Sequence, residues 1–209
     1  QAMLLLGTDM ASQATRDTFE MITKFRILPG CIGVYRFGDD EVSVAEIEEI
    51  VVGGRDMPFE DYVSCRTMNL LIETYINNGL FEEIFSALNA MGVPTFDVLG
   101  HLHENPRLFS PLMTEIIDRF VDETVGDLYE SHQEAETFAL APKNMEKFMS
   151  GELGNNELLE HRALLYLDLE EIIAVLRRAI GEILESRNLI DVGVARFFDQ
   201  LTQFTVCKK

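Results

Sequence analysis

Cysteine is scarce in this chain and tryptophan is absent. The 209 residues contain three cysteines, Cys31, Cys65 and Cys207, and no Trp. Because the three thiols are widely separated and odd in number, they form neither a disulfide framework nor a CxxC metal motif. Scattered free cysteines are typical of a reducing compartment, so we expect a cytoplasmic protein.

Basic residues are also few. The sequence has 17 Lys and Arg against 36 Asp and Glu, which gives a formal net charge of −19 at pH 7. Binding to nucleic acid and attachment to an anionic membrane both need clusters of positive charge, so this balance argues against either partner. Acid-rich helix surfaces that keep the protein soluble are the simplest explanation.

Long apolar runs and targeting signals are missing as well. No stretch of about 18 uncharged apolar residues is present, so we expect no membrane-spanning helix. The N-terminus lacks the basic and apolar regions of a signal peptide. Hydrophobic residues nevertheless make up 47% of the chain and charged residues 25%, which is typical of a folded globular protein.

Extended segments are concentrated in the first quarter of the chain. Residues 12–24 suit a helix with Ser12 as its N-cap. Two β-branched runs follow, at 26–37 and 42–52, and the sequence Gly38-Asp39-Asp40-Glu41 joins them. Gly and Asp at such a junction favour a tight turn, so we expect a β-hairpin here.

The remainder of the chain has helical periodicity. After residue 54 the spacing of apolar residues changes from 2 to about 3.6 and stays there. The predicted fold class is mainly α: a helical bundle with a small N-terminal β-hairpin region (α+β at the N-terminus). The predicted regions are 1–56, with a short apolar strand that would end a preceding domain, a helix and the hairpin, and 57–209, the bundle. We expect its helices at about 56–78, 80–91, 95–103, 108–129, 143–149, 158–184 and 190–204.

Histidines and carboxylates give only weak metal motifs. His101, His103 and Glu104 form an HxHE string, but residues two apart on a helix point roughly 200° apart. No nearby Cys or His completes a tetrahedral set. Glu157 and His161 are four apart instead of the three of a di-iron Glu-x-x-His motif, and no second copy exists. We therefore expect surface or interhelical side chains at these positions.

Motifs for catalysis are missing too. The sequence has no GxGxxG or Walker loop after a strand, and nothing combines a nucleophile, a base and an oxyanion donor. Cys31, within the segment Pro29-Gly30-Cys31-Ile32-Gly33, would expose a thiol near tight turns. A small buried side chain is the more common role for a free cysteine. We expect the chain to be inactive by itself.

The segment from Lys24 to Tyr62, KFRILPGCIGVYRFGDDEVSVAEIEEIVVGGRDMPFEDY, is the most distinctive part of the chain. This segment and the residues before it together resemble the region that follows the catalytic barrel in cobalamin-binding radical S-adenosylmethionine (SAM) enzymes. The similarity covers about residues 1–85. Its motifs are MLLxGT at 3–8, RxLPGCxGVY at 26–35, the acidic strand EIEEIVV at 46–52, and the helix opening FEDY at 59–62 with Arg66.

The resemblance implies a parent enzyme with a cobalamin-binding domain and a central iron–sulfur barrel that cleaves SAM. This chain would be its C-terminal accessory domain, which closes the substrate cavity and excludes water. Its partner would be the upstream barrel of the same chain, and the three-cysteine cluster motif, SAM and cobalamin would belong to the other domains. The residues expected to face substrate are Arg26, Cys31 and Tyr35. A cut near the barrel, before Gln1, would expose apolar surface and allow an artificial dimer.

Two other functions remain open. A stand-alone helical interaction module would bind a protein partner in a groove between long helices. A small independent enzyme or ligand-binding bundle would need a convergent set of polar side chains, which the sequence does not reveal. No motif identifies the substrate or the reaction of the parent enzyme.

Overall fold

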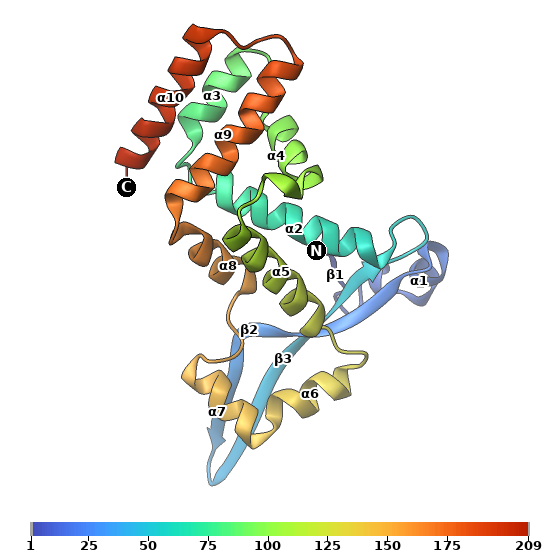
Figure 1. Cartoon of the computed structure of the whole chain (residues 1–209). Coiled ribbons are helices and arrows are strands. Elements are labelled where there is room, and N and C mark those ends of the chain that lie inside the picture. Colours follow the sequence, from blue (N-terminus) through green and yellow to red (C-terminus); the bar gives the residue numbers. More distant parts are fainter. Residues whose placement is uncertain (1, 209) are drawn as a thin grey trace. The chain divides into compact units, whose positions relative to one another are not determined.

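The computed structural model describes residues 2–208 and is mainly helical, with ten α-helices in the described part and a three-stranded antiparallel sheet near the N-terminus (Figure 1). The predicted helical class with an N-terminal β region is confirmed. None of the described helices is long and apolar enough to cross a membrane.

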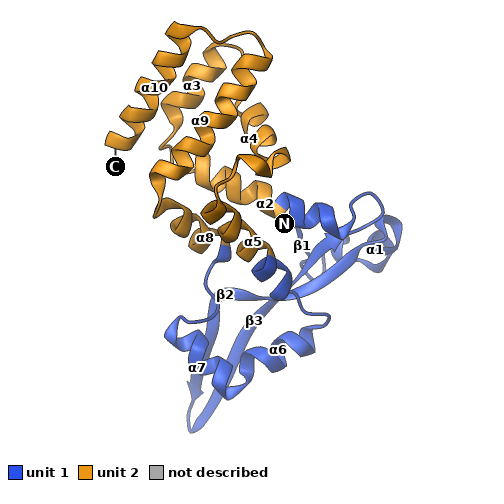
Figure 2. Cartoon of the chain, in the orientation of Figure 1, with its two compact units in different colours: residues 1–65, 122–157 blue, residues 66–121, 158–209 orange. Residues whose placement is uncertain are grey.

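The chain forms two compact units, each made from two separate stretches (Figure 2). Unit 1 comprises residues 1–65 and 122–157, and unit 2 comprises residues 66–121 and 158–209. The regions 1–56 and 57–209 expected from the order of the chain do not coincide with these units. The difference arises because residues 122–157 return to the sheet.

The sheet of unit 1 is built on a long β-hairpin. Strands β2 (Ile22–Phe37) and β3 (Asp40–Gly53) pair antiparallel, and β1 (Ala2–Met3) lies on the other edge of β3. The predicted hairpin is confirmed, although β2 begins at Ile22 instead of Arg26. Its register shifts between Ile27 and Ile32. The intervening segment contains Pro29, which has no N–H for the ladder, so the strand bulges there.

Helix α1 (Gln13–Phe19) is shorter than the helix predicted over 12–24. Ser12 caps it as expected, accepting a hydrogen bond from the Thr15 N–H, and Glu20 ends it in the left-handed conformation at φ 48°. From Ile22 onward the chain is already paired with β3. Ladder hydrogen bonds to a distant strand therefore override the local helical pattern.

The apolar run at 3–8 leads into a turn, and Met3 is its only residue in strand conformation, since β1 consists of Ala2 and Met3. The Leu4 N–H donates to the Glu49 carbonyl at 2.8 Å, and Leu4 is buried. Leu5 and Leu6 are 56% and 93% exposed. A 3-10 turn (Asp9–Ala11) then leads into α1.

Two helices from the later stretch of unit 1 pack on the hairpin (Figure 1): α6 (His132–Leu140) on both long strands and α7 (Pro142–Ser150) on β2. The sequence predicted only one helix here, at 143–149. Helix α6 was missed because its buried face consists of Ala135 and Ala139, which give little apolar periodicity.

Unit 2 is helical throughout, and α9 supplies much of its core. Nine α9 residues are buried, and the helix packs against α4 and α10. Helices α2 and α5 each begin in one unit and end in the other. The remaining elements of the chain are α2 (Phe59–Tyr75), α3 (Glu82–Ala90), α4 (Thr95–Glu104), a 3-10 turn (Pro106–Leu108), α5 (Pro111–Gly126), α8 (Glu157–Tyr166), α9 (Leu169–Ser186) and α10 (Val192–Cys207).

The long helix predicted over 158–184 is wrong, because the structure has two helices there. Helix α8 ends at Tyr166, Leu167 is 81% exposed, and the Asp168 carboxylate accepts a hydrogen bond from the Glu171 N–H at 3.2 Å. Aspartate caps a helix better than it fills a helix interior, so the chain restarts at this residue. The helix predicted over 108–129 is similarly shorter, since it begins at Pro111.

Candidate functional site

The candidate site is a cavity of about 80 Å³ that lies entirely within unit 1. A space of this size holds several water molecules or one small ligand group. The hairpin, the ends of α2 and α5, and the segments around α6 and α7 supply its lining. The polar residues of this lining are Arg26, Tyr62, Thr124, Asp127, Tyr129, Asn155 and Glu157.

Among residues 2–208, Arg26 is the only basic residue that lines the cavity. The β register places it opposite Glu48, and its guanidinium pairs with the Glu48 carboxylate. A second ion pair, at 3.4 Å, joins Arg26 to Glu157 at the start of α8. The Glu48 and Glu157 side chains are only 8% and 13% exposed. Arg26 therefore offsets the cost of holding two carboxylates out of water.

Asp127 adds another carboxylate just after α5. Burial raises the pKa of its carboxyl group, and the negative charges of Glu157 and Glu123 raise it further, while Arg26 acts in the opposite direction. The residue as a whole remains exposed, so solvent moderates these effects. No hydrogen bond reaches the Asp127 carboxylate from the part of the chain that the structure describes. This carboxylate is therefore available to a ligand.

Thr124 and Tyr129 are two hydroxyl-bearing residues of the lining. Thr124 is 5% exposed, and its Oγ1 is buried without a hydrogen-bond partner among residues 2–208. Such a hydroxyl destabilises the fold unless a water or a ligand meets it. Burial, then the charges of Asp127 and Glu134, raise the pKa of Tyr129 to about 12. The Tyr129 phenol therefore stays protonated at neutral pH.

Aromatic rings form one wall of the cavity. The Phe138 ring lies 5.5 Å from that of Tyr129 and 6.4 Å from that of Phe148, centroid to centroid. Gly154, in the loop after α7, lies close to this wall. Its φ is +75°, and a Cβ atom at this position would lie 2.6 Å from the Phe148 ring. Only glycine fits both conditions without a shift of the ring.

The structure separates the three residues expected to face substrate. Arg26 lines the cavity, whereas Cys31 and Tyr35 lie elsewhere on the hairpin. Cys31 is half-buried in the bulge of β2, and Tyr35 is 55% exposed opposite Val42. A substrate-facing role for these three residues stays a prediction.

Sequence reasoning missed most of the cavity. Thr124, Asp127 and Tyr129 were not considered, because single polar residues near a helix end carry no recognisable pattern. Glu157 was considered only as part of a failed di-iron motif. Its role depends on Arg26, which is 131 residues away along the chain.

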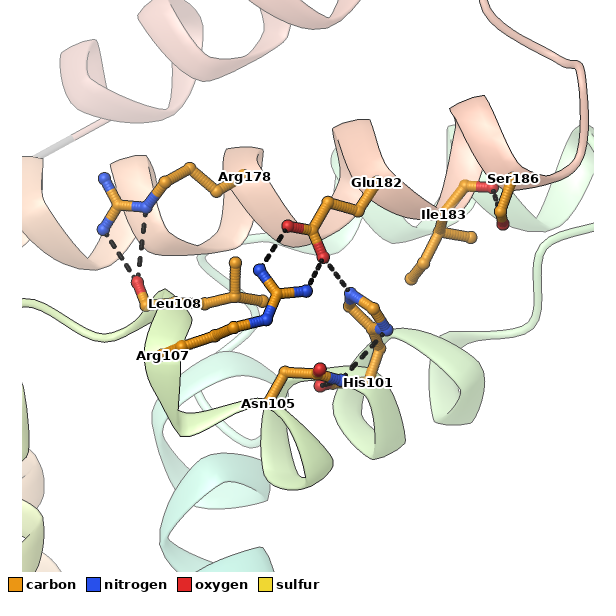
Figure 3. A network of polar contacts seen from close by, with 8 residues as sticks. All are labelled: His101, Asn105, Arg107, Leu108, Arg178, Glu182, Ile183 and Ser186. Carbon is orange, nitrogen blue, oxygen red and sulfur yellow. Dashed lines mark hydrogen bonds and ion pairs between the residues drawn. The ribbon is translucent and has the colours of Figure 1, made fainter.

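His101, the first histidine of the HxHE string, belongs to a polar network in unit 2 (Figure 3). His101 Nε2 lies 2.8 Å from Glu182 Oε2, and Arg107 donates two hydrogen bonds of 2.9 Å to the same carboxylate. These contacts, from Arg107 first and then His101, lower the pKa of Glu182. The network joins α4 and the following turn to α9, so His101 is an interhelical residue as predicted. His161 is fully buried, with its ring 5.4 Å from that of Phe120.

The described residues do not assemble the donor set of an iron–sulfur cluster. Cys31 lies on β2, Cys65 on α2, and Cys207 at the end of α10. No group of three or more His, Cys, Asp or Glu in residues 2–208 is placed to hold a metal ion. The described residues therefore do not suit the cluster of a radical SAM enzyme, which needs three closely spaced thiolates.

Comparison with known proteins gives no relative: no family model matches the chain, and no curated protein matches its sequence. The resemblance to cobalamin-binding radical SAM enzymes stays a prediction from the motifs of residues 1–85.

Proposed function

We propose that this chain is the C-terminal accessory region of a cobalamin-binding radical SAM enzyme of the cytoplasm, and that unit 1 forms part of the wall of its substrate cavity. The region is not catalytic by itself. The cluster, SAM and cobalamin belong to other domains of the parent enzyme. The observation that carries the proposal is the position of Arg26. This residue belongs to the segment that resembles the family and lines the cavity beside Asp127 and Glu157.

The geometry of β2 supports this role. The bulge between Ile27 and Ile32 turns part of the strand out of the ladder, and Ile27 and Pro29 contribute to the cavity lining. Bulges commonly re-aim side chains next to functional sites. A wall segment that places charged and apolar groups out of water can orient a substrate and keep water from a reactive intermediate.

The far end of the hairpin supports docking of unit 1 onto another protein surface. Alternation along the strands places Tyr35 and Phe37 on the same face as their neighbours Val42 and Val44. Their exposed fractions are 55%, 67%, 44% and 39%. In the proposed parent enzyme this apolar face would meet the upstream barrel. In a chain without the barrel it would favour an artificial dimer.

The second candidate is a stand-alone interaction module. The same exposed face of the hairpin favours it, since such a patch also suits an independent protein partner. This module would bind with the hairpin and not with the groove between long helices expected from the sequence.

The coding sequence upstream of Gln1 tests the proposal directly. An in-frame CxxxCxxC motif about two hundred residues before Gln1 would support it, because three closely spaced thiolates hold the cluster of a radical SAM enzyme. A start codon immediately upstream, without such a motif, would overturn the proposal and leave the interaction module.

A second experiment tests the role of Arg26 in the intact enzyme. We expect Arg26→Ala to lower the kcat/KM for product formation by about tenfold or more while SAM cleavage without substrate continues. Arg36→Ala is the matched control. Arg36 lies on the same strand with an 81% exposed side chain, and we expect less than about a twofold change. Equal effects of the two substitutions would contradict a specific role for the cavity.

A further inference from the structure

We propose that the free edge of β3 binds an extended segment of a partner protein, which adds to the sheet as a further antiparallel strand. The segment would have apolar residues at its centre and basic residues towards its ends. This inference goes beyond the proposed function and does not depend on it, because binding is measured on this chain itself.

One edge of β3 is open along most of its length. The pairing of β1 with β3 ends near Glu49, whose carbonyl accepts the Leu4 N–H at 2.8 Å, far from the turn of the hairpin (Figure 1). Between Ile47 and Asp40, all backbone hydrogen bonds of β3 with described residues belong to the ladder with β2. Helix α6 contacts β2 as well as β3, so it lies on a face of the hairpin and leaves this edge free.

The open edge presents hydrogen-bonding groups to an incoming strand. In an antiparallel ladder, the N–H and C=O groups of successive residues point alternately to the two edges of a strand. The Glu49 carbonyl points to β1, so the corresponding groups of Ile47, Ala45, Ser43 and Glu41 point to the same edge. Such a row of outward N–H and C=O groups is the template on which an added strand pairs.

This part of β3 lacks the features that usually protect an edge. Lysine, proline and bulges commonly prevent an exposed strand from pairing with another chain. Residues 40–49 contain no Lys, Arg or Pro. The outer edge of β2, by contrast, carries Arg36 and is interrupted by the bulge that contains Pro29. The edge of β3 is therefore the better acceptor of a further strand.

Charge and apolar character together define the partner. Val42 and Val44 are 44% and 39% exposed. The exposed residues Asp40 and Glu41 precede them, and the exposed Glu46 follows them. An added strand would place its central side chains beside the valines and its outer side chains beside the carboxylates. Apolar residues at the centre of the segment and basic residues at its ends therefore complement this edge.

A second copy of this chain complements the edge less well. If two β3 strands paired antiparallel about Ser43, Asp40 of each would lie directly opposite Glu46 of the other. Like charges directly opposite each other destabilise a sheet. The net charge of −19 adds to the repulsion between two copies. Charge complementarity therefore favours a different, basic partner.

The test is a titration of the chain with the peptide Lys-Thr-Val-Thr-Val-Lys-Lys, blocked at both ends and followed by the backbone amide NMR signals of Ser43 and Ala45. Paired antiparallel with residues 40–46, its valines lie opposite Val42 and Val44, and its lysines lie opposite the carboxylates. We expect saturable binding and slower exchange of both amides with solvent, because peptide carbonyls would accept their N–H groups. Failure to saturate would overturn the inference.

Two control peptides separate strand pairing from charge. Replacing the lysines by glutamates should weaken binding by about tenfold or more, because like charges would then meet at the edge. N-methylation of the second, fourth and sixth peptide residues keeps the charge but removes the N–H groups that would face β3. This change should also weaken binding by about tenfold or more. If the N-methylated peptide binds as tightly as the original, the contact is electrostatic only and the inference is wrong.

Substitutions of Ser43 locate the peptide on β3. Ser43→Pro removes an outward N–H at an edge position, where proline is compatible with a sheet, and should weaken binding by about tenfold. Ser43→Lys adds a repulsive charge at an exposed position and should weaken binding by about threefold, so it keeps the test valid if the proline variant does not fold. Val34→Pro and Val34→Lys are the matched controls.

Val34 lies directly opposite Ser43 on β2, and its N–H therefore points to the other edge of the hairpin. The Val34 variants should change the Kd by about twofold at most. Equal effects at Val34 and Ser43 would overturn the inference, because the peptide would then not occupy the edge of β3.

Sedimentation of the chain without peptide tests the other occupant. A dimer that Ser43→Pro abolishes and Val34→Pro does not would assign the edge to a second copy and overturn the inference. A monomer that binds the lysine peptide supports it. If that peptide binds but no CxxxCxxC motif is found upstream, the proposed function fails and the strand-binding edge stands.

Discussion

Arg26 and Glu157 lie 131 residues apart in the sequence, and their side chains form an ion pair of 3.4 Å within unit 1. Between them along the chain lie residues 66–121, which belong to unit 2. The pair therefore closes unit 1 from two distant stretches, and the cavity exists only where these stretches meet.

Replacing Arg26 tests how much its ion pairs contribute to the free energy of unfolding. Arg26→Met should lower the free energy of unfolding by about 2–3 kcal/mol, because it removes a cation that pairs with the Glu48 carboxylate, whose side chain is 8% exposed. Urea denaturation followed by circular dichroism measures the change. Arg36→Met is the control, since the ion pair of Arg36 with Glu41 is exposed and long, and we expect less than about 0.5 kcal/mol. A small effect at Arg26 would mean that the buried carboxylates are neutral or paired otherwise.

Replacing Thr124 should change the free energy of unfolding in the opposite direction. Thr124→Val removes a buried hydroxyl without a partner and should raise the free energy of unfolding by about 1 kcal/mol. Thr74→Val is the same substitution at a hydroxyl that donates to the Leu70 carbonyl at 2.7 Å. There we expect a loss of about 0.5–1 kcal/mol. Thermal denaturation of both variants checks the contrast, and a loss at Thr124 would show that its hydroxyl is satisfied in solution.

Gly154 controls the shape of the aromatic wall. Gly154→Ala should cost about 2–3 kcal/mol, because the left-handed backbone strains any residue with a Cβ atom and the new methyl group meets the Phe148 ring. Gly151→Ala separates the two causes, since Gly151 has φ +77° but no atom within 4 Å of an added Cβ. We expect about 1 kcal/mol at that position. Equal losses at the two glycines, measured by urea denaturation, would rule out the contact with Phe148.

The Glu49 carboxylate should contribute to the pH dependence of the free energy of unfolding. Arg16 donates two hydrogen bonds to this carboxylate, of 2.5 and 2.7 Å, and the pairing lowers the pKa of Glu49. A lowered folded-state pKa stabilises the fold above the ordinary glutamate value of about 4.3, and this contribution is lost as pH falls through the folded-state pKa. Glu49→Gln should therefore lower stability by about 1 kcal/mol at pH 7, and the difference should vanish in acid. A difference that persists at pH 2–3 would contradict this origin.

Local patterns in the sequence accounted for most of the secondary structure. The Gly-Asp junction at 38–41 predicted the hairpin, and helical periodicity predicted most of the helices. The errors have specific causes: Asp168 interrupts an apolar stripe that continues on both sides, and α6 buries alanines instead of large apolar residues. At the first place one capping residue, and at the second a face of small residues, decided the structure, and the pattern of large apolar side chains shows neither.

The sequence by itself determined the mainly helical class, the N-terminal hairpin, and the acidic surface charge, because each depends on composition or on residues close along the chain. Only the tertiary structure decided that residues 122–157 pack on β2 and enclose a cavity with Arg26. The carboxylates of Glu48 and Glu157 look like ordinary surface charges in the sequence. Their burial, and the missing partner of Thr124, result from contacts between distant segments, which no local pattern encodes.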